Sequence, residues 1–138
     1  MAKIRQVGGR ISERVMKQYD IEINSAQGRI MFALWQQDGI SINELAGKTQ
    51  LKKSTLTSML DRLEQMGYLK RRPSQKDRRK ILIYRTAKDR ALESKYAQVS
   101  QEMTRIFYEG FASDRIDRFE RDLVQILKNL IRREADLK

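Results

Sequence analysis

Two helical segments in the middle of the chain decide the fold, Ser41-Ile42-Asn43-Glu44-Leu45-Ala46 and Lys53-Ser54-Thr55-Leu56-Thr57-Ser58-Met59-Leu60-Asp61-Arg62-Leu63. In the first, Ser41 and Glu44 have the spacing of a capping box, in which the serine oxygen accepts one free backbone N–H and the glutamate reaches back to another. A helix therefore begins at Ser41 or Ile42. In the second, leucines recur at positions i, i+4 and i+7 and share one buried face. With residues 47–50 as the turn between them, the two segments are predicted to form a helix-turn-helix.

A short β-hairpin is predicted directly after these helices. Gly67 ends the second helix, and residues 68–72 have the composition of a strand. Residues 80–85 alternate two isoleucines on one face with Leu82 and Tyr84 on the other, which is the pattern of a second strand. The fold class is therefore mainly α with a small β-wing, a winged helix-turn-helix.

Amphipathic helices precede this lobe. Residues 8–9 are both glycine, and each glycine costs roughly 1 kcal/mol relative to alanine, so we expect the first helix to fray or kink there. The next helix begins with Asn24 or Ser25 as its cap and ends near residues 38–39. The apolar side chains of the two helices recur at helical spacing, Ile4, Val7, Ile11 and Val15 in the first and Ile30, Met31, Leu34 and Trp35 in the second.

Two more helices follow the wing, one from about residue 87 to 109 and one capped by Ser113 after a break at Gly110. Each carries an apolar face, and one small lobe cannot easily cover both faces, so we expect a homodimer. The alternative is that they pack only on each other and on the first helix. The face of the first helix is a narrow seam of Leu92, Tyr96, Val99, Met103 and Ile106. The face of the second helix is a wide stripe of Ile116, Phe119, Leu123, Ile126, Leu127, Leu130 and Ile131.

The charge balance points to an anionic partner. The chain of 138 residues, enough for one domain, has 29 Lys and Arg against 18 Asp and Glu, a net charge of +11. Such an excess favours nucleic acid first and an anionic membrane surface second. We expect double-stranded DNA as the partner and no membrane.

The exposed face of the second helix of the helix-turn-helix suggests how DNA is bound. Hydroxyl side chains crowd its first two turns, where free N–H groups and the helix dipole favour phosphate. Short hydroxyls also allow a helix to lie deep in a major groove. The alternative is a solvated helix start in which Ser54 or Thr55 only caps the helix. The candidate DNA-binding residues here are Lys52, Lys53, Ser54, Thr55, Thr57, Ser58 and Arg62.

The loop between the two strands is strongly basic. Its cations surround a single acid, Asp77, and a loop cannot bury so much charge. The loop is therefore either an idle solvated tip or a contact to phosphates and the minor groove, and the adjoining hydroxyl-rich helix favours the second interpretation. Besides Arg71 at the start of this region, the candidate DNA-binding cations are Arg72, Lys76, Arg78, Arg79 and Lys80.

Missing residue types and motifs argue against an enzyme. The chain has no Cys and no His, which excludes thiol chemistry, makes the usual zinc sites unlikely to form and removes the commonest general base. Acids at 114, 117 and 120 alternate with arginines, as in solvated helical ion pairs. We expect no cofactor and no metal. Because no signal peptide or membrane span is recognisable, we expect a cytoplasmic protein.

These motifs together resemble the MarR family of bacterial transcriptional regulators. The resemblance lies in Glu44-Leu45-Ala46, Lys53-Ser54-Thr55-Leu56-Thr57, Asp61-Arg62-Leu63-Glu64, Gly67, Arg71-Arg72, Asp77-Arg78-Arg79 and Thr86. One departure concerns the corner after the wing, where the Leu-Thr-x-x-Gly typical of the family reads Arg85-Thr86-Ala87-Lys88-Asp89.

The resemblance implies a single MarR-like domain, with a DNA-binding lobe at about residues 24–86 and dimerisation helices at about 1–20 and 87–138. It implies a homodimer that binds a pseudo-palindromic operator, usually as a repressor. It assigns the hydroxyl-rich turns to the major groove, Arg62 to a phosphate, and Arg79 to the minor groove. It makes Asp77 the acid that stabilises the wing.

The resemblance also implies control by a small aromatic or anionic ligand. Such a ligand would bind in a crevice between the dimerisation helices and the DNA-binding lobe. Candidate ligand-binding residues are Tyr19, Arg29, Met31, Trp35 and Met66, each of which the sequence explains equally as core or surface. The rival function is a winged-helix module that binds DNA without sequence preference, or that binds RNA or protein, without ligand control.

Overall fold

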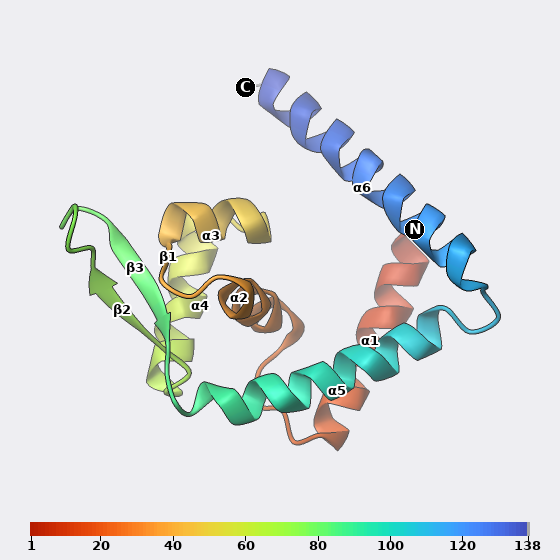
Figure 1. Ribbon diagram of the computed structural model, residues 1–138, viewed down its shortest axis with the longest axis horizontal. Coiled ribbons are helices and arrows are strands. Elements are labelled where there is room, and N and C mark those ends of the chain that lie inside the picture. Colours follow the sequence, from red (N-terminus) through yellow and green to blue (C-terminus); the bar gives the residue numbers. More distant parts are fainter. Residues whose placement is uncertain (138) are drawn as a thin grey trace. The chain divides into compact units, whose positions relative to one another are not determined.

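A computed structural model describes residues 1–137. Its backbone forms two compact units, residues 1–102 and 103–137, which are described separately below. The elements are α1 (Ala2–Gln18), α2 (Ser25–Gln36), β1 (Ile40–Ser41), α3 (Ile42–Thr49), α4 (Lys53–Gln65), β2 (Leu69–Pro73), β3 (Ile81–Arg85), α5 (Asp89–Phe107) and α6 (Ser113–Asp136) (Figure 1).

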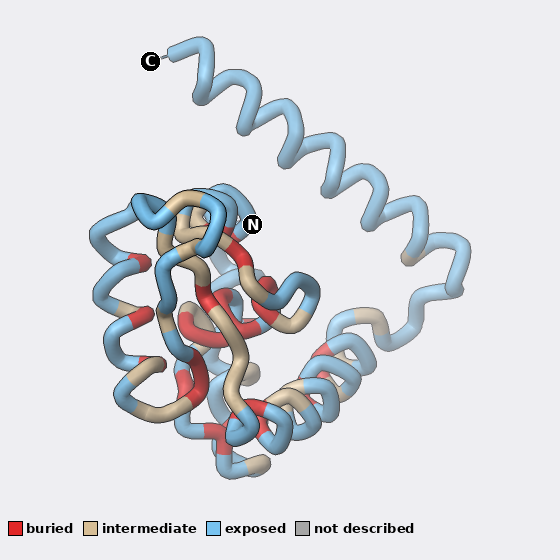
Figure 2. The backbone as a smooth tube through the Cα atoms, turned by 60° about the vertical axis from the view of Figure 1, so that its left-hand side comes forward, coloured by how far each residue is buried: buried red, intermediate tan, exposed pale blue. Residues whose placement is uncertain are grey.

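The core of the first unit lies between α2, α3, α4 and the sheet. Figure 2 shows buried positions on one side of each of these elements. The predicted leucine face of α4 is completely buried, which confirms that this side of the helix packs inward. Side chains that are at most 1% exposed include Ile30, Met31, Leu34, Ile40, Leu45, Leu56, Leu60, Leu63, Leu69 and Ile83.

The sheet has one strand more than the sequence predicted. Both predicted strands form, β2 and β3, and pair antiparallel with Arg71 opposite Ile83. On its other side β3 pairs with the two-residue strand β1, where Ile40 lies opposite Ile83. β1 therefore ties the start of the helix-turn-helix to the wing. The hairpin of β2 and β3 extends beyond the helices of this unit (Figure 1).

Side-chain caps begin α2 and α3. The predicted cap Asn24 is confirmed: its Oδ1 accepts from the Gln27 backbone N–H at 2.8 Å, and its own N–H donates to Gln27 Oε1 at 2.9 Å. Ser41 caps α3 by accepting from the Glu44 N–H at 3.2 Å. The Glu44 carboxylate, however, accepts from the Ser41 hydroxyl rather than from a backbone N–H. The full capping box predicted here is therefore only half formed.

Three boundary predictions were wrong. α1 continues through residues 8–9 without a break, and Gly8 is buried. The predicted turn at residues 47–50 is mostly helix, because α3 ends only at Thr49 and is followed by its C-cap Gln50, whose φ of 57° is left-handed. The cap of α6 is Ala112 and not Ser113, which is the first helical residue.

The apolar seam of α5 packs inside the first unit. Leu92 and Val99 are buried, and the Tyr96 ring stacks edge-on against Trp35 with centroids 5.3 Å apart. Gly28 of α2 leaves the space that the Tyr96 ring occupies. This part of the seam is therefore used within one chain, as in the alternative in which the helices pack on their own chain.

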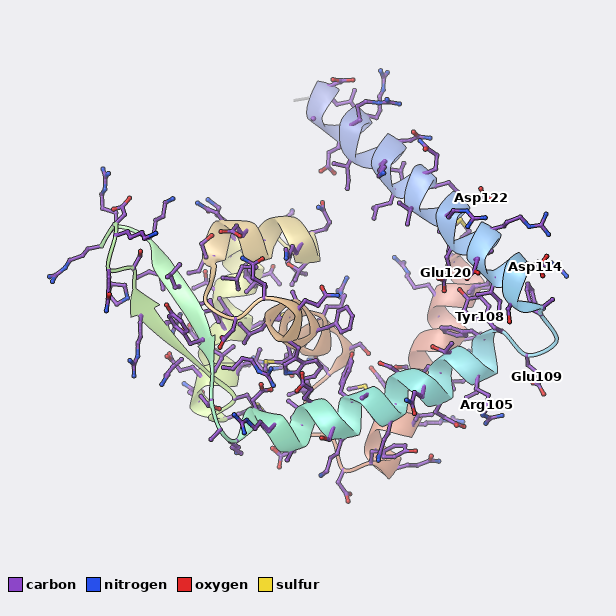
Figure 3. All side chains as sticks on the ribbon, viewed as in Figure 1. Arg105, Tyr108, Glu109, Asp114, Glu120 and Asp122 are labelled. Carbon is purple, nitrogen blue, oxygen red and sulfur yellow. The ribbon has the colours of Figure 1, made fainter. Side chains whose placement is uncertain are left out.

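The second unit contains the end of α5 and α6. Gly110, with φ of 86°, turns the chain between them. The Tyr108 hydroxyl donates to the Glu120 carboxylate at 3.0 Å, and both side chains are labelled in Figure 3. None of the described residues of α6 is buried. Its predicted apolar stripe is accordingly exposed, with fractions of 38–63% over Phe119, Leu123, Ile126, Leu127, Leu130 and Ile131.

Gly28→Ala should destabilise the first unit, because the new Cβ would lie 2.8 Å from Tyr96 Cε2 and Cζ. Overpacking of this kind costs about 1–3 kcal/mol. Gly47→Ala is the matched control, since its Cβ would have no atom within 4 Å and alanine favours a helix by about 0.5–1 kcal/mol. Urea unfolding measures both. Equal stabilisation by the two substitutions would contradict the packing of Tyr96 over Gly28.

Candidate nucleic-acid interface

The start of α4 presents hydroxyls and free backbone N–H groups to solvent. Its N-cap is Lys52, and no side chain among residues 1–137 caps it. The alternative in which Ser54 or Thr55 serves only as a cap is therefore wrong. Thr57 donates its hydroxyl to the Lys53 carbonyl at 2.8 Å, which leaves its methyl group and its oxygen lone pairs facing outward. All seven candidates on α4 are exposed, namely Lys52, Lys53, Ser54, Thr55, Thr57, Ser58 and Arg62.

Asp77 organises the tip of the wing. Its Oδ1 accepts from the Arg79 backbone N–H at 3.1 Å and from Arg79 Nε at 3.3 Å. Its carbonyl accepts from the Lys80 N–H at 2.9 Å, and the Lys80 carbonyl accepts from Ser74 at 2.8 Å. One carboxylate thus holds both the turn and the base of the Arg79 side chain, which is itself 92% exposed.

The remaining cations of the wing differ in what they face. Arg72, Lys76, Arg78 and Lys80 are exposed. Arg71 instead faces α4, where its guanidinium contacts Asp61 at 2.6 Å and Glu64 at 2.8 Å, and its N–H donates to Glu64 at 3.1 Å. Arg71 is therefore a link between α4 and β2 and does not belong to the cationic tip. Its hydrogen bonds hold the pKa of Glu64 below the ordinary value.

Positive charge is concentrated in this lobe. Residues 25–86 contain 13 Lys and Arg against five Asp and Glu, a net charge of +8 out of +11 for the chain. The helix start and the wing tip contribute most of these cations. The lobe therefore attracts polyanions, and the rest of the chain is close to neutral.

A buried carboxylate at the corner after the wing was missed by the sequence analysis. Asp89 is completely buried, and its oxygens accept from Trp35 Nε1 at 2.8 Å and from Arg85 Nε at 2.6 Å. Arg85 also contacts Glu93 at 2.9 Å, and its backbone N–H donates to Asp38 at 2.8 Å. The departure from Leu-Thr-x-x-Gly was the signal in the sequence that could have located this cluster.

An open hollow of about 610 Å³ lies between α2, α3 and α5. It combines aromatic side chains with two cations, Arg29 and Lys48. Of the five candidate ligand residues only Arg29 lines it. Met31 is completely buried, and Trp35 is bonded to Asp89. The five candidates thus do not surround one crevice. The lining is Arg29, Phe32, Ala33, Gln36, Lys48, Thr49, Tyr96 and Ser100.

Among residues 1–137, no group of three metal-ligating side chains lies close enough together to hold an ion. No described helix has both the length and the apolar character that crossing a membrane requires.

Residues 23–81, from the end of the first linker into β3, match the MarR family when the chain is compared with known protein families. This segment of the chain is similar to the MarR family. Over 74 residues it is 34% identical to the HTH-type transcriptional regulator TtmR of Methylorubrum extorquens, a match that includes 54% of this chain. The chain spans only 38% of the length of TtmR. The name of TtmR describes a transcriptional regulator.

Solved MarR structures share the fold of this chain. A cysteine-to-serine mutant of E. coli MarR in complex with operator DNA superposes with a TM-score of 0.76 at 22% identity, over 91% of this chain and 92% of that one. BpsR of Bordetella bronchiseptica, described as regulated in its DNA binding by 6-hydroxynicotinic acid, superposes with a TM-score of 0.71 at 20% identity, over 94% and 91%. These likenesses confirm the winged helix-turn-helix fold.

The Glu64 link between α4 and β2 should make stability depend on pH. Because the pKa of Glu64 is lowered in the folded state, its contribution is complete above the unfolded pKa of about 4.5 and is lost as the pH falls through the folded value. Glu64→Gln should lower the free energy of unfolding by about 0.5–1 kcal/mol at pH 7, allowing for solvent screening, and flatten the curve of stability between about pH 5 and 3. Urea unfolding at several pH values tests this.

The matched control is Glu13→Gln, an exposed carboxylate on α1. It should change stability by less than about 0.5 kcal/mol at any of these pH values. Parallel curves for Glu64→Gln and the native chain would show that the link to Arg71 contributes nothing.

Proposed function

We propose that this protein is a sequence-specific transcriptional regulator, acting as a repressor, that binds double-stranded DNA as a homodimer. The observation that carries the proposal is the exposed hydroxyl-rich start of α4 beside a wing tip whose Arg79 is held by Asp77. The names of TtmR and of the MarR complex with operator DNA support the same function.

In this proposal α4 is the recognition helix. A B-DNA major groove is about 12 Å wide and admits an α-helix, and small side chains on the leading face allow a close approach. Ser54, Thr55 and Thr57 would face base edges, with Ser58 beside them. The uncapped N–H groups and the cations Lys52 and Lys53 would bind phosphates.

The wing would bind the neighbouring backbone and minor groove. Arginine is favoured in a narrow minor groove because of the negative potential there. Arg79 is the candidate, since its backbone and Nε are fixed by Asp77 while its guanidinium end extends into solvent. Phosphate contacts would come from Arg62, Arg72, Lys76, Arg78 and Lys80.

A homodimer follows from the exposed stripe of α6. Exposed apolar surface of this extent on one helix marks a protein interface, and a second copy offers the same stripe. In the proposed domain organisation, residues 24–86 bind DNA and residues 1–20 and 87–138 dimerise. Two recognition helices about 34 Å apart would then enter successive major grooves of one pseudo-palindrome.

Selection of bound sequences from a random duplex library at about 150 mM salt tests the proposal, because this salt suppresses purely electrostatic binding. We expect a pseudo-palindrome with half-sites about one helical turn apart, and a dimer in light scattering. Binding without an enriched motif would favour the rival, an architectural DNA-binding or RNA-binding module. A monomer at micromolar concentration would overturn the dimer.

Two variants tested on the selected operator separate the contacts. Arg79→Ala should weaken binding about tenfold and lower the salt slope by about one phosphate, whereas Thr57→Ala should relax base preference with less effect on the slope. Lys95→Ala, an exposed cation on α5, is the control and should bind as the native chain does. Unchanged binding by both test variants would refute the groove assignment.

We further propose that a small aromatic anion controls DNA binding from the hollow between α2, α3 and α5. The observation in its favour is the pairing of aromatic walls, Phe32 and Tyr96, with the cations Arg29 and Lys48 in a hollow of suitable size. BpsR, with the same fold, is described as regulated by an aromatic acid.

The test uses 6-hydroxynicotinic acid and benzoate as probes. Either probe should raise the melting temperature and reduce operator affinity, and the effect should be lost in Arg29→Met with Lys48→Met. Lys95→Met, which removes a cation on α5 that does not line the hollow, should respond as the native chain does. No shift with either probe at millimolar concentration would count against this ligand class.

A further inference from the structure

The two ends of the five-residue corner 85–89 depart together from the family pattern. A leucine is replaced by Arg85 and a glycine by Asp89, and these two side chains are bonded to each other at 2.6 Å. With only one of the two changes, Asp89 would lose its cationic partner or Arg85 would keep only Glu93 of its two carboxylates. The paired change therefore replaces the leucine and glycine of the family pattern by an ion pair at the same corner.

The corner joins α2, β3 and α5 around a carboxylate that has no access to solvent. Asp89 is completely buried, and the Arg85 side chain is only 24% exposed. The carboxylate receives one hydrogen bond from Trp35 of α2 and one from the end of β3. A buried carboxylate that loses one of two donors carries an uncompensated charge, so the geometry of this corner resists change.

Each strand of the wing is thereby held by its own arginine. Arg71 attaches β2 to α4 through Asp61 and Glu64, while Arg85 attaches β3 to α5 and α2 through Asp89 and Glu93. An isolated two-stranded hairpin is only marginally stable in water, so its direction depends on such attachments. We call Arg85 with Asp89 the corner pair.

The distance from the corner to the wing tip amplifies small movements. Arg79 lies in the turn just before β3, and the five residues of β3 span roughly 15 Å at about 3.3 Å per residue, so the wing tip lies at least about that far from Arg85. A rotation of about 10° at the corner would move the tip by about 3 Å. That movement exceeds the tolerance of a hydrogen bond to a phosphate or base.

We infer that Asp89 is a positioning residue for DNA binding: through Arg85 it fixes the direction of β3 and so places Arg79 in its groove. The inference rests on the proposed function. It assigns to Asp89 no contact with DNA. The recognition helix does not depend on the corner pair, because α4 is held by the burial of Leu56, Leu60 and Leu63.

A double-mutant cycle on the selected operator tests this role. Asp89→Asn keeps the shape of the side chain and removes its charge, and it should weaken operator binding about tenfold. Combined with Arg79→Ala it should weaken binding little further, rather than about 100-fold, because a misdirected wing has already lost the Arg79 contact. The salt slope should fall by about one phosphate in each single variant and no further in the double variant.

Thr57→Ala provides the matched control. Its effect should add to that of Asp89→Asn, because α4 is positioned independently of the corner. If Asp89→Asn only destabilised the whole protein, its effect would combine in the same way with Arg79→Ala and with Thr57→Ala. A non-additive effect with Arg79→Ala alone therefore cannot come from general destabilisation. If Asp89→Asn does not fold, Arg85→Lys replaces it in the cycle, since lysine keeps the charge but cannot reproduce the geometry of the guanidinium between Asp89 and Glu93.

The outcomes separate this inference from the proposed function. Absence of duplex binding by the native chain would refute the proposed function. Native binding with unchanged affinity in Asp89→Asn, or with full additivity between Asp89→Asn and Arg79→Ala, would overturn the positioning role and leave the proposed function intact. Unchanged binding by Arg79→Ala alone would overturn the positioning role and the wing contact together.

Discussion

The burial of Leu56, Leu60 and Leu63 is the constraint on which the rest of this molecule depends. These leucines turn one side of α4 into the core, so the opposite side must face solvent. The polar residues of α4 lie on that opposite side because of helical geometry alone. The same core supports the sheet, since Ile40 and Ile83 are equally buried and face each other across β1 and β3. The spacing of the three leucines therefore determines both the packing of the core and the exposure of the polar face of α4.

The wing is positioned by charge as well as by apolar packing. Burial of Leu69 and Ile83 holds its two strands at their base, but the loop between the strands is cationic and exposed. Arg71 and Arg85 add further attachments, each through a pair of carboxylates. A lobe with a net charge of +8 therefore uses two of its cations, Arg71 and Arg85, to attach its wing. The few acids of this region have structural roles, and Asp77 is the clearest case.

The features that the sequence predicted are those decided within a few residues. The cap at Asn24, the leucine face of α4 and the hairpin strands follow from spacing and local hydrogen bonding. The features that it missed depend on partners distant along the chain. Trp35 and Asp89 are 54 positions apart, and β1 becomes a strand only because β3 passes beside it.

The candidate binding residues also divide into those that local spacing identifies and those that depend on distant parts of the chain. The exposed cations and hydroxyls could be identified because their exposure follows from the helical and strand periodicity. Arg71 was placed with the basic loop because its acceptors, Asp61 and Glu64, lie on another element. The hollow could not be located, since its walls come from three helices and the placement of Tyr96 depends on the absence of a side chain at Gly28.

Trp35, the single tryptophan of the chain, lies against both the Tyr96 ring and the Asp89 carboxylate. Indole emission responds to a neighbouring charge and to energy transfer from a nearby tyrosine, so the protein contains a natural fluorescent reporter at the junction of the hollow and the wing.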